Sequence, residues 1–395
     1  MKSRKWIIGG LIMLILFSAG MIAGKVRAQG ELERKLEIYL QVLSLVKNNY
    51  VEKNLDDKKL VYGSIKGLLT ALDDPYTRFM EPTSYKEMRI RLRGKYSGIG
   101  IYIGIKDNQL QVISPIPGTP ASKAGLKAKD KILKIEDQAT KDMGLEEAVS
   151  LIRGEQGTKV KLQIVRGTAK EPKEYSIKRE NISIKSTEFY MLPDKIAYIK
   201  LTTFEKQNAP QEIEKAIQDA RKKGAQGLIL DLRGNGGGLL DNAIDIGSMF
   251  IRSGIIVQTV DREGQKEVKY SSGRILWWQP MAVLINEASA SASEILAGAL
   301  KDHKIATVVG THSFGKASVQ SVRVLADNSA VLLTIAKYLT PDGTDISKKG
   351  IQPDVLVELP TKEAEAEAEV PVVEGVQHDA QLDRAIELIR SQIKT

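Results

Sequence analysis

The chain has 395 residues, 42% of them hydrophobic and 27% charged, which is enough for two or three domains with hydrophobic cores. It has no cysteine and three histidines without an H-E-x-x-H pattern, which excludes disulfides and thiolate chemistry and leaves little material for a metal site. The net charge of +9 is spread along the chain without basic runs that alternate with aromatics, so it indicates a solvated surface or mild attraction to an anionic membrane and not nucleic-acid binding.

Residues 1–28 have the pattern of a targeting segment. Three basic residues precede residues 6–24, a run of 19 residues without charge. This length suits a signal peptide and equally a signal anchor with a single transmembrane segment. The small residues before position 29 allow cleavage after Ala28, so the cleaved and the anchored form both remain open. The basic flank predicts that the rest of the protein is exported from the cytoplasm.

Residues 29–93 are predicted to form an N-terminal helical region. Leu36, Leu40 and Leu43 recur at helical spacing, and apolar residues do so again between positions 60 and 69. The sequence Asp-Asp-Pro-Tyr at positions 73–76 breaks the pattern. Such a helical arm can pack on its own body or on a second copy as a homodimer, and the sequence leaves both arrangements open.

Residues 94–180 change to short alternating strands with two small helices, a succession that resembles a PDZ domain. Gly98-Ile99-Gly100-Ile101 precedes a strand and looks like the carboxylate-binding loop of that domain. Backbone N–H groups freed by glycines form a nest for a terminal carboxylate, and the strand that follows accepts an extended peptide by β-augmentation. The sequence therefore predicts a peptide-binding site at Gly98, Ile99, Gly100 and Ile101.

Strands and helices alternate over residues 181–360, which predicts an α/β core with helices covering a sheet. The strand predicted over residues 227–232 runs into three consecutive glycines at 236–238, and an apolar strand at 281–286 precedes the helix that begins at Ser291. Residues 361–395 are predicted to form an acidic, alanine-rich linker and a final amphipathic helix.

Ser291-Ala292-Ser293-Glu294 has the spacing of a capping box in front of an amphipathic helix. An N-cap role alone would explain this pattern. The same position also places a serine beside the unpaired N–H groups and the positive end of a helix dipole, which is the environment that an oxyanion needs. The spacing alone leaves open whether Ser291 only caps the helix or is also a nucleophile.

Residues 310–316 match the phosphate-loop pattern G-x-x-x-x-G-K. Ala317, however, stands where a phosphate loop has the serine or threonine that holds magnesium. A helix should follow a phosphate loop, but residues 318–325 alternate as a strand does. Nucleotide binding is therefore not expected, and Lys316 is instead a candidate base for Ser291, since Ser–Lys pairs are a known variant of the activated hydroxyl.

Four motifs in one order resemble the carboxyl-terminal processing peptidases, an S41-type family of Ser–Lys endopeptidases. They are the Gly98–Ile101 module, Asp231-Leu-Arg-Gly-Asn-Gly-Gly-Gly238, Ser289-Ala-Ser-Ala-Ser-Glu294 and Phe314-Gly-Lys-Ala-Ser-Val-Gln320. The resemblance covers roughly residues 30 to 360. It implies a PDZ-like domain joined to an α/β peptidase core of ββα, crotonase-like type at 181–360. It also implies Ser291 as nucleophile, Lys316 as base and Gln320 as the residue that assists the lysine.

The chemistry of a lysine base makes a demand that can be checked. With an ordinary pKa, Lys316 would be neutral in roughly one molecule in 2,500 at pH 7, so its surroundings must supply about 4 kcal/mol against the charged form. In an extended strand Gln320 would lie on the same face and hold the amine without adding a carboxylate. We expect the oxyanion hole to consist of the N–H groups of Ala292 and of Gly237 or Gly238.

Several further residues receive structural interpretations. Asp231 and Arg233 are expected to pair and organise the turn before the glycines, and Glu294 to cap its helix. A Ser–His–Asp arrangement would need His303 or His312, which we expect to be surface residues. Trp277 and Trp278 are expected to pack locally, with a lining role in a substrate path as the alternative.

The sequence thus predicts an exported serine endopeptidase that uses no cofactor and cuts proteins with flexible carboxyl termini. As the resemblance implies, the PDZ-like domain binds the substrate tail and controls access to Ser291 and Lys316. Arg153, at the end of a predicted helix, is a candidate for coupling tail binding to assembly of the site. The alternative function is a non-catalytic PDZ scaffold that only binds peptides.

Overall fold

The computed structural model describes residues 31–359 apart from positions 94, 107–108, 142, 168, 170 and 184, and then residues 372–373, 376–377 and 379–393. The chain divides into two compact units, Met1–Ala71 and Leu72–Thr395. The expected targeting segment 1–28 and almost all of the expected acidic linker lie outside the described residues. Among the helices that are described, none is both long and apolar enough to cross a membrane.

The first unit contains the predicted helical arm. It consists of a helix over residues 31–49 and of α2 (Asp57–Thr70), and Lys47 and Asp57 form an ion pair at 2.9 Å. Asp56 caps α2, since its carboxylate accepts a hydrogen bond from the backbone N–H of Lys59 at 3.1 Å. The helix over 31–49 exposes apolar side chains such as Leu36 and Leu40.

The second unit begins with a strand where the sequence predicted a helical region. Residues Arg78–Met80 form β1, which is followed by helix α3 (Pro82–Leu92). β1 pairs antiparallel with β18 (Ala330–Leu339), and Phe79 and Met80 are buried by this pairing. The partner strand lies some 250 residues further along the chain, so local helical periodicity gave the wrong prediction here.

The PDZ-like part consists of a twisted sheet with two small helices. Its strands pair in the order β3–β4–β5–β7–β8, with β6 on β5. The first and last strands of this part, β2 and β9, pair with each other as a separate ribbon. The helices are α4 (Pro120–Lys123) and α5 (Leu145–Ile152). The strands are β2 (Lys95–Gly98), β3 (Ile101–Lys106), β4 (Gln109–Pro115), β5 (Lys131–Ile135), β6 (Gln138–Ala139), β7 (Lys159–Val165), β8 (Lys173–Lys178) and β9 (Glu180–Ser183).

A six-stranded sheet forms the centre of the α/β core. Its order is β10–β11–β12–β15–β16–β19, and all neighbours are parallel except the antiparallel edge strand β10. The strands β12 and β15 are buried along their whole length, as expected of parallel strands covered on both faces. The bounds are β10 (Thr187–Leu192), β11 (Ile196–Leu201), β12 (Gly227–Asp231), β15 (Met281–Ile285), β16 (Thr307–Gly310) and β19 (Val355–Leu356).

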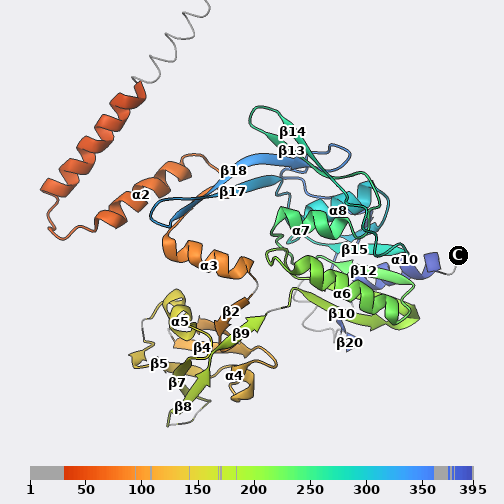
Figure 1. The fold of residues 1–395 in the computed structure, drawn as a ribbon, viewed down its shortest axis with the longest axis horizontal. Coiled ribbons are helices and arrows are strands. Elements are labelled where there is room, and N and C mark those ends of the chain that lie inside the picture. Colours follow the sequence, from red (N-terminus) through yellow and green to blue (C-terminus); the bar gives the residue numbers. More distant parts are fainter. Residues whose placement is uncertain are drawn as a thin grey trace, which may run out of the picture. The chain divides into compact units, whose positions relative to one another are not determined.

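Helices cover both faces of this sheet (Figure 1). Leu228 and Leu230 of β12 pack with α6 (Ala209–Lys222), α7 (Leu240–Gly247) and α8 (Ala292–Asp302) in one hydrophobic cluster. Ile229, between them, packs on the opposite face with α10 (Ala380–Ile393). This alternation follows from the two-residue period of a strand. The predicted fold class, a PDZ-like domain with an α/β core and a helical arm, is confirmed.

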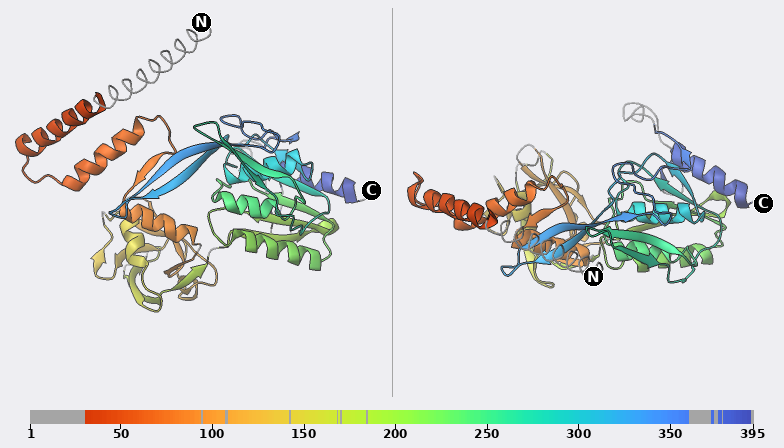
Figure 2. Two further views of the ribbon diagram at one scale, coloured as in Figure 1. Left: turned by 45° about the horizontal axis from the view of Figure 1, so that its top comes forward. Right: turned by 90° about the horizontal axis from the view of Figure 1, so that it is seen from above.

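A second sheet projects from the core. β17 (Ser318–Val324) and β18 form a long ribbon, with β1 on one side of β18 and β13 (Ile255–Asp261) and β14 (Lys266–Tyr270) further along it (Figure 2). Because β17 begins two residues after Lys316, this ribbon positions the predicted base. A short 3₁₀ turn, Pro193–Lys195, and a hairpin of β20 (Val372–Val373) and β21 (Val376–Gln377) complete the described elements.

Candidate active site

The residues predicted to be catalytic follow the carboxyl ends of three neighbouring parallel strands. The glycine-rich loop follows β12, the turn that carries Ser291 follows β15, and the loop that carries Lys316 follows β16. Since the carboxyl ends of parallel strands meet at one edge of a sheet, the topology brings together segments that are far apart in sequence.

The serine-rich turn contains three serines with different surroundings. The hydroxyl of Ser289 donates to the carbonyl of Leu232 at 2.9 Å, and that of Ser293 donates to the carbonyl of Asn235 at 2.8 Å. Both side chains are fully buried. Ser291, between them, is only partly buried and lines a cleft. The outer serines therefore fasten the turn to the glycine-rich loop, and the middle one faces the cleft.

Ser291 has a strained backbone. Its φ is 55° and its ψ is −115°, a combination that residues with a side chain rarely adopt. It is the N-cap residue of α8, and its backbone N–H donates to Glu294 Oε2 at 2.7 Å. Strain of this kind is kept where the surrounding contacts fix the conformation, and here it holds the nucleophile candidate at the start of a helix.

The glycine-rich loop lies directly against the Ser291 turn. A Cβ on Gly237, which has a φ of 93°, would lie 2.8 Å from the Ala292 nitrogen and 2.9 Å from Ser291 Cβ. The Gly237 N–H itself donates to Asn235 Oδ1 at 2.9 Å. Within the described part of the chain, the N–H groups of Gly238 and Ala292 hold no hydrogen bond. Of the two glycines considered as oxyanion donors, Gly238 is therefore the one whose N–H group is available.

Lys316 is half-buried, and its ammonium group lies over an aromatic ring. Its Nζ is 4.5 Å from the centre of the Tyr76 ring, the geometry of a cation–π contact. Burial lowers the pKa of Lys316 and the nearby Arg78 lowers it further, whereas Asp74 and Glu294 act in the opposite direction. The net shift has the direction that a lysine base requires.

Gln320 lies on β17 and points to other partners than Lys316. Its Nε2 donates to Ser318 Oγ at 2.9 Å and to Thr334 Oγ1 at 3.4 Å. The structure thus brings Gln320 into the same cleft as Lys316, but the two side chains form no hydrogen bond with each other among the described contacts.

Glu294 links the two halves of the site. Its buried carboxylate accepts hydrogen bonds from the backbone N–H groups of Ser291, Gly315 and Lys316, at 2.7, 2.7 and 3.0 Å. The hydroxyl of Ser313 donates to it at 2.6 Å. The hydroxyl of Tyr338 lies within hydrogen-bond distance of Glu294 Oε2 (3.3 Å) and of the carbonyls of Ser291 and Lys316. Glu294 is thus more than the helix cap that the sequence predicted.

The cleft has a volume of about 520 Å³ and unites the predicted catalytic residues. Ser291, Ala292, Lys316, Gln320 and the glycines 236–238 all line it. Apolar side chains from α3, the start of α7, α8 and the β17–β18 ribbon form the rest of its wall: Met88, Leu92, Leu239, Leu240, Ile295, Val319, Val322 and Leu332. This wall offers space for apolar substrate side chains.

Asp231 and Arg233 pair as the sequence predicted, beneath the glycine-rich loop. Arg233 Nη2 lies 2.7 Å from Asp231 Oδ2, and Tyr198 donates to the same oxygen at 2.6 Å. Arg233 Nη1 reaches Asp379 at 2.7 Å and Gln381 at 3.0 Å, at the start of α10. Burial alone would lower the pKa of Arg233, but Asp231 and Asp379 raise it above its usual value.

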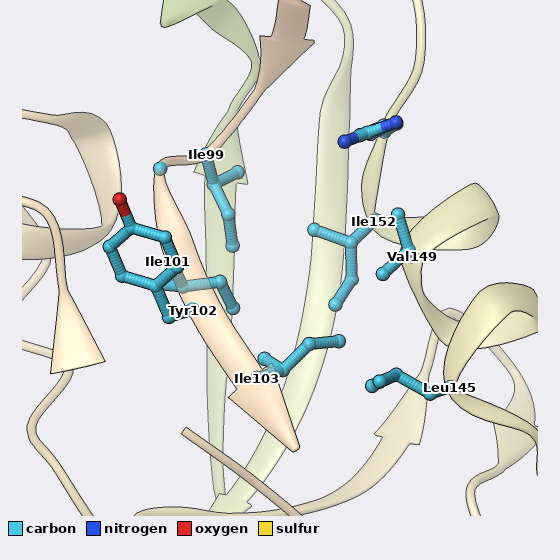
Figure 3. Close-up of a pocket in the computed structure, with 9 residues that line it drawn as sticks. Ile99, Ile101, Tyr102, Ile103, Leu145, Val149 and Ile152 are labelled. Carbon is cyan, nitrogen blue, oxygen red and sulfur yellow. The ribbon is translucent and has the colours of Figure 1, made fainter. Parts of the chain in front are cut away.

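A second groove, of about 220 Å³, lies in the PDZ-like part between β3 and α5. Figure 3 shows Ile103 pointing from β3 toward Leu145, while Val149 and Ile152 point from α5 into the same space. β3 is the edge strand of its sheet, so its outer edge is available for a further strand. Ile99, Gly100 and Ile101 line the groove, whereas Gly98 is paired with Glu180 at the end of β2.

Gly100 has a conformation and a packing that only glycine allows. Its φ is 78°, and a Cβ there would lie 2.4 Å from Thr119 Cβ. The Thr119 hydroxyl donates to the Gly100 carbonyl at 3.0 Å, which holds the loop in place. The backbone at Gly100 is thus preformed at one end of the groove.

Arg153 lies at the same end of the groove and connects it to α3. Its guanidinium pairs with the carboxylate of Glu87, one residue before Met88 in the wall of the active-site cleft. The backbone carbonyl of Leu92, at the end of α3, accepts a hydrogen bond from Gln207 at 3.0 Å. One short helix therefore contacts both the peptide groove and the cleft.

The alternative catalytic residues lie elsewhere. His303 Nε2 lies 2.7 Å from the Ile255 carbonyl, and His312 is exposed and lines a different cavity. Trp277 is buried in the core, whereas Trp278 is exposed beneath the guanidinium of Arg221. The described residues contain no group of three or more His, Asp or Glu side chains arranged to hold a metal ion.

Four residues of the site carried no functional prediction. Asn235 belongs to the D-x-R-G-N turn and Glu87 is a charged residue of α3, but neither pattern indicates which residue it contacts. Tyr76 reaches Lys316 from a loop 240 positions away, and Tyr338 reaches it from β18, which pairs with β17 in a hairpin. Finding Tyr338 needed the register of this hairpin, and finding Tyr76 needed the placement of the loop before β1.

Comparison with known proteins agrees with this architecture. Residues 195–357 match the family model for peptidase family S41, residues 87–165 the PDZ domain, and residues 18–84 the activating protease CtpB N-terminal domain. Carboxy-terminal processing protease CtpA of Bacillus subtilis is 39% identical over 351 residues, 89% of this chain and 74% of that protein. The carboxyl-terminal-processing protease of Synechocystis is 38% identical over 345 residues, 86% of this chain and 80% of that protein.

A solved structure has a similar fold. The photosystem II D1 C-terminal processing protease matches with a TM-score of 0.50 and 31% identity, covering 86% of this chain and 96% of that one. Fold and matches define a serine-type peptidase with a PDZ domain. The chain belongs to the carboxyl-terminal processing proteases of peptidase family S41. This membership decides against the non-catalytic scaffold.

Proposed function

We propose that the protein is an exported endopeptidase that cuts other proteins near their carboxyl ends with a Ser291–Lys316 dyad. The PDZ groove binds the substrate tail. One observation carries the proposal: Ser291, Lys316 and the available N–H groups of Gly238 and Ala292 border the same 520 Å³ cleft. A nucleophile, a base and an oxyanion site are the parts that acyl transfer requires.

In the proposed reaction, Ser291 Oγ attacks the scissile carbonyl carbon while neutral Lys316 Nζ takes the hydroxyl proton. The C–N bond then breaks, and the Lys316 ammonium returns the proton to the leaving amine. Lys316 next deprotonates a water molecule, which hydrolyses the acyl-enzyme and restores Ser291. Lys316 must come within hydrogen-bond distance of Ser291 Oγ for these steps. The N–H groups of Gly238 and Ala292 would stabilise the oxyanion.

The protonation state of Lys316 sets the pH dependence of this reaction. Because its pKa is lowered by burial and by Arg78, a larger fraction is neutral near pH 8 than for a lysine in water. Activity should rise with pH as the ammonium loses its proton. Gln320 would orient the neutral amine, for which its Nε2 and Oε1 must turn from Ser318 and Thr334.

The groove between β3 and α5 supports the tail-binding part of the proposal. An extended peptide would pair with the open edge of β3, and its carboxylate would meet the backbone at Ile99, Gly100 and Ile101. The apolar lining favours apolar side chains at the carboxyl end. Arg153 would link an occupied groove to α3 through Glu87.

Export, membrane contact and a homodimer through the terminal helices belong to the same proposal. The export proposal is based on residues 1–28, and a reporter fused after residue 28 should appear outside the cytoplasm.

The exposed apolar side chains of the helix over 31–49 support self-association, which sedimentation should detect and which removal of residues 1–50 should weaken. Nucleic acids are not expected as partners, and a gel-shift assay would test this.

The decisive experiment measures cleavage of an unfolded model protein by the purified chain. Ser291→Ala should reduce the rate at least 10³-fold, and Lys316→Arg should do the same because arginine stays charged. Lys222→Arg is a matched control, since Lys222 is an exposed lysine of α6. Full activity of Ser291→Ala or Lys316→Arg would disprove the dyad, and inactivity of Lys222→Arg would show that the assay reports folding.

A further inference from the structure

The segment that leads into β1 contacts Lys316 directly and is linked to Gln320 through Thr334. This 74–78 segment (residues 74–78) lies beside the active-site cleft, and its Arg78 lines the cleft wall. Its Tyr76 presents a ring face to the Lys316 ammonium, with 4.5 Å between Nζ and the ring centre. A cation over an aromatic face is attracted by the ring quadrupole, so this contact favours the charged lysine.

The same segment reaches Gln320 through one intermediate residue. The Thr77 hydroxyl accepts a hydrogen bond from the backbone N–H of Thr334 at 3.0 Å. The Thr334 hydroxyl in turn lies 3.4 Å from Gln320 Nε2. Gln320 is thus held on the side of Ser318 and Thr334, while Lys316 is held on the side of Tyr76.

The 74–78 segment is itself firmly fixed. Asp74 accepts hydrogen bonds from the Thr77 hydroxyl at 2.7 Å and from the backbone N–H of Tyr76 at 3.0 Å. Burial acts to raise the pKa of Asp74, but its hydrogen bonds with Thr334 and Thr77 lower it on balance, so this carboxylate stays ionised. The pairing of Arg78 with Leu332 then joins the segment to the β17–β18 ribbon.

We propose that Tyr76 is a positioning residue that holds Lys316 charged and away from Ser291 in the resting enzyme, while Thr77 holds Gln320 apart through Thr334. Catalysis then requires Nζ to leave the ring before it can take the Ser291 proton. This inference rests on the proposed Ser291–Lys316 mechanism. The 74–78 segment thereby positions Lys316 and Gln320, a role that its turn-like sequence does not indicate.

The charges around Lys316 allow the effect of the ring to be isolated. The charged and titratable groups that face it are Asp74, Tyr76, Arg78, Glu294 and Tyr338. A substitution of Tyr76 alone leaves the other four in place. Tyr76→Leu removes the ring face and keeps an apolar, although shorter, side chain beside the ammonium. Tyr76→Phe keeps the face and loses only the hydroxyl.

Substitutions of Tyr76 should shift the pH profile of cleavage in a direction set by the ring. Removal of the ring face destabilises the ammonium, which lowers the pKa of Lys316 and moves the acid limb of kcat/KM toward lower pH. On that limb Tyr76→Leu should cleave an unfolded model protein about 2- to 5-fold faster than the unchanged chain. Tyr76→Trp, with the strongest quadrupole, should move the limb the other way. Tyr76→Phe should follow the unchanged chain.

The experiment records pH profiles of kcat/KM for the full chain and these three variants, and the rate at which a fluorophosphonate labels Ser291. The labelling rate does not depend on tail binding, and it should rank Leu above Phe and Phe above Trp. Thr77→Val, of nearly the same shape, should also label faster because it removes the acceptor of the Thr334 N–H and loosens Thr334, although Asp74 keeps its bond with the Thr334 hydroxyl. Melting temperatures identify any variant that fails to fold, and the remaining substitutions still give the order.

Identical profiles and labelling rates for the folded Leu, Phe and Trp variants would overturn the role of Tyr76. The proposed function would survive that result as long as Ser291→Ala abolishes cleavage and labelling. Persistent cleavage in Ser291→Ala would instead refute the proposed function, whatever the Tyr76 variants do. The two failures are therefore distinguishable in one set of measurements.

Discussion

At the residue scale, the carboxylate of Glu294 joins the helix that carries Ser291 to the loop that carries Lys316. It is 1% exposed and accepts hydrogen bonds from backbone groups on both sides. A buried carboxylate is costly to desolvate unless such donors surround it, and here they converge on both oxygens. The same contacts support the strained conformation of Ser291, since its N–H group is one of the donors.

Glu294→Gln is therefore expected to disrupt the site without changing its volume. An amide has one acceptor oxygen, so its NH₂ group would face N–H donors that the carboxylate now satisfies. We expect kcat to fall at least 10²-fold and the free energy of unfolding to fall by about 2–3 kcal/mol. Kinetics and chemical denaturation measure these effects. Glu287→Gln, at an exposed position nearby, is the control, and equal behaviour of both variants would refute the linking role.

The chemistry of single residues could be predicted from the sequence as far as it is local. The spacing of Ser291 and Glu294 indicated the cap, and Ala317 excluded the phosphate loop. The hydrogen bond from the Gly237 N–H to Asn235 Oδ1 is an Asx turn over two positions, a local signal that was missed. Tyr76 was noted only as part of a helix-breaking turn, since its contact with Lys316 spans 240 positions.

At the element scale, the pattern of apolar residues correctly predicted two kinds of element: helices with one buried face and strands that are buried along their whole length. α6 has a strong apolar stripe, and β12 is a continuous apolar run. β1 was missed because its pairing with β18 is not local. The contact of α10 with Arg233 was also missed, although both motifs had been recognised separately, since 146 positions separate Arg233 from Asp379.

The C-terminal helix α10 is predicted to stabilise the glycine-rich loop through Arg233. Asp379 Oδ1 accepts from the backbone N–H of Leu382 at 2.9 Å, and Oδ2 binds Arg233 at 2.7 Å. Asp379→Asn keeps a helix-capping side chain and removes one of the two negative charges that pair with Arg233, so it tests this ion pair and not the cap. Because Arg233 is nearly buried but keeps Asp231 as an ion-pair partner, loss of the second carboxylate should cost about 1–2 kcal/mol of stability.

The same substitution should lower kcat about 3- to 10-fold and change KM less, because the loop carries the proposed oxyanion donor. Differential scanning calorimetry and steady-state kinetics give the two readouts. Glu387→Gln, exposed on the same helix, is the control. A loss of stability with unchanged kcat would show that α10 supports the fold alone.

At the scale of the whole molecule, α3 lies between a groove that fits a peptide tail and a cleft that fits a scissile bond. Its Glu87 pairs with Arg153 at the groove, and its Met88 and Leu92 line the cleft. A shift of this helix would alter both sites together. Tail binding can change catalysis only if it favours one position of such an element over another.

Glu87→Gln tests this coupling while leaving Arg153 and the groove unchanged. The unchanged chain should cleave a substrate with a free apolar carboxyl terminus about 10-fold faster than the same substrate with an amidated terminus. In Glu87→Gln this ratio should fall to about 2-fold or less, although the affinity for a tail peptide, measured by titration, should change less than about 3-fold. Glu147→Gln, exposed on α5, should retain the full ratio. If Glu87→Gln also keeps the full ratio of cleavage rates, the Arg153–Glu87 pair has only a structural role and does not couple tail binding to catalysis. If the affinity for the tail peptide and the ratio fall together, the pair acts in tail binding itself.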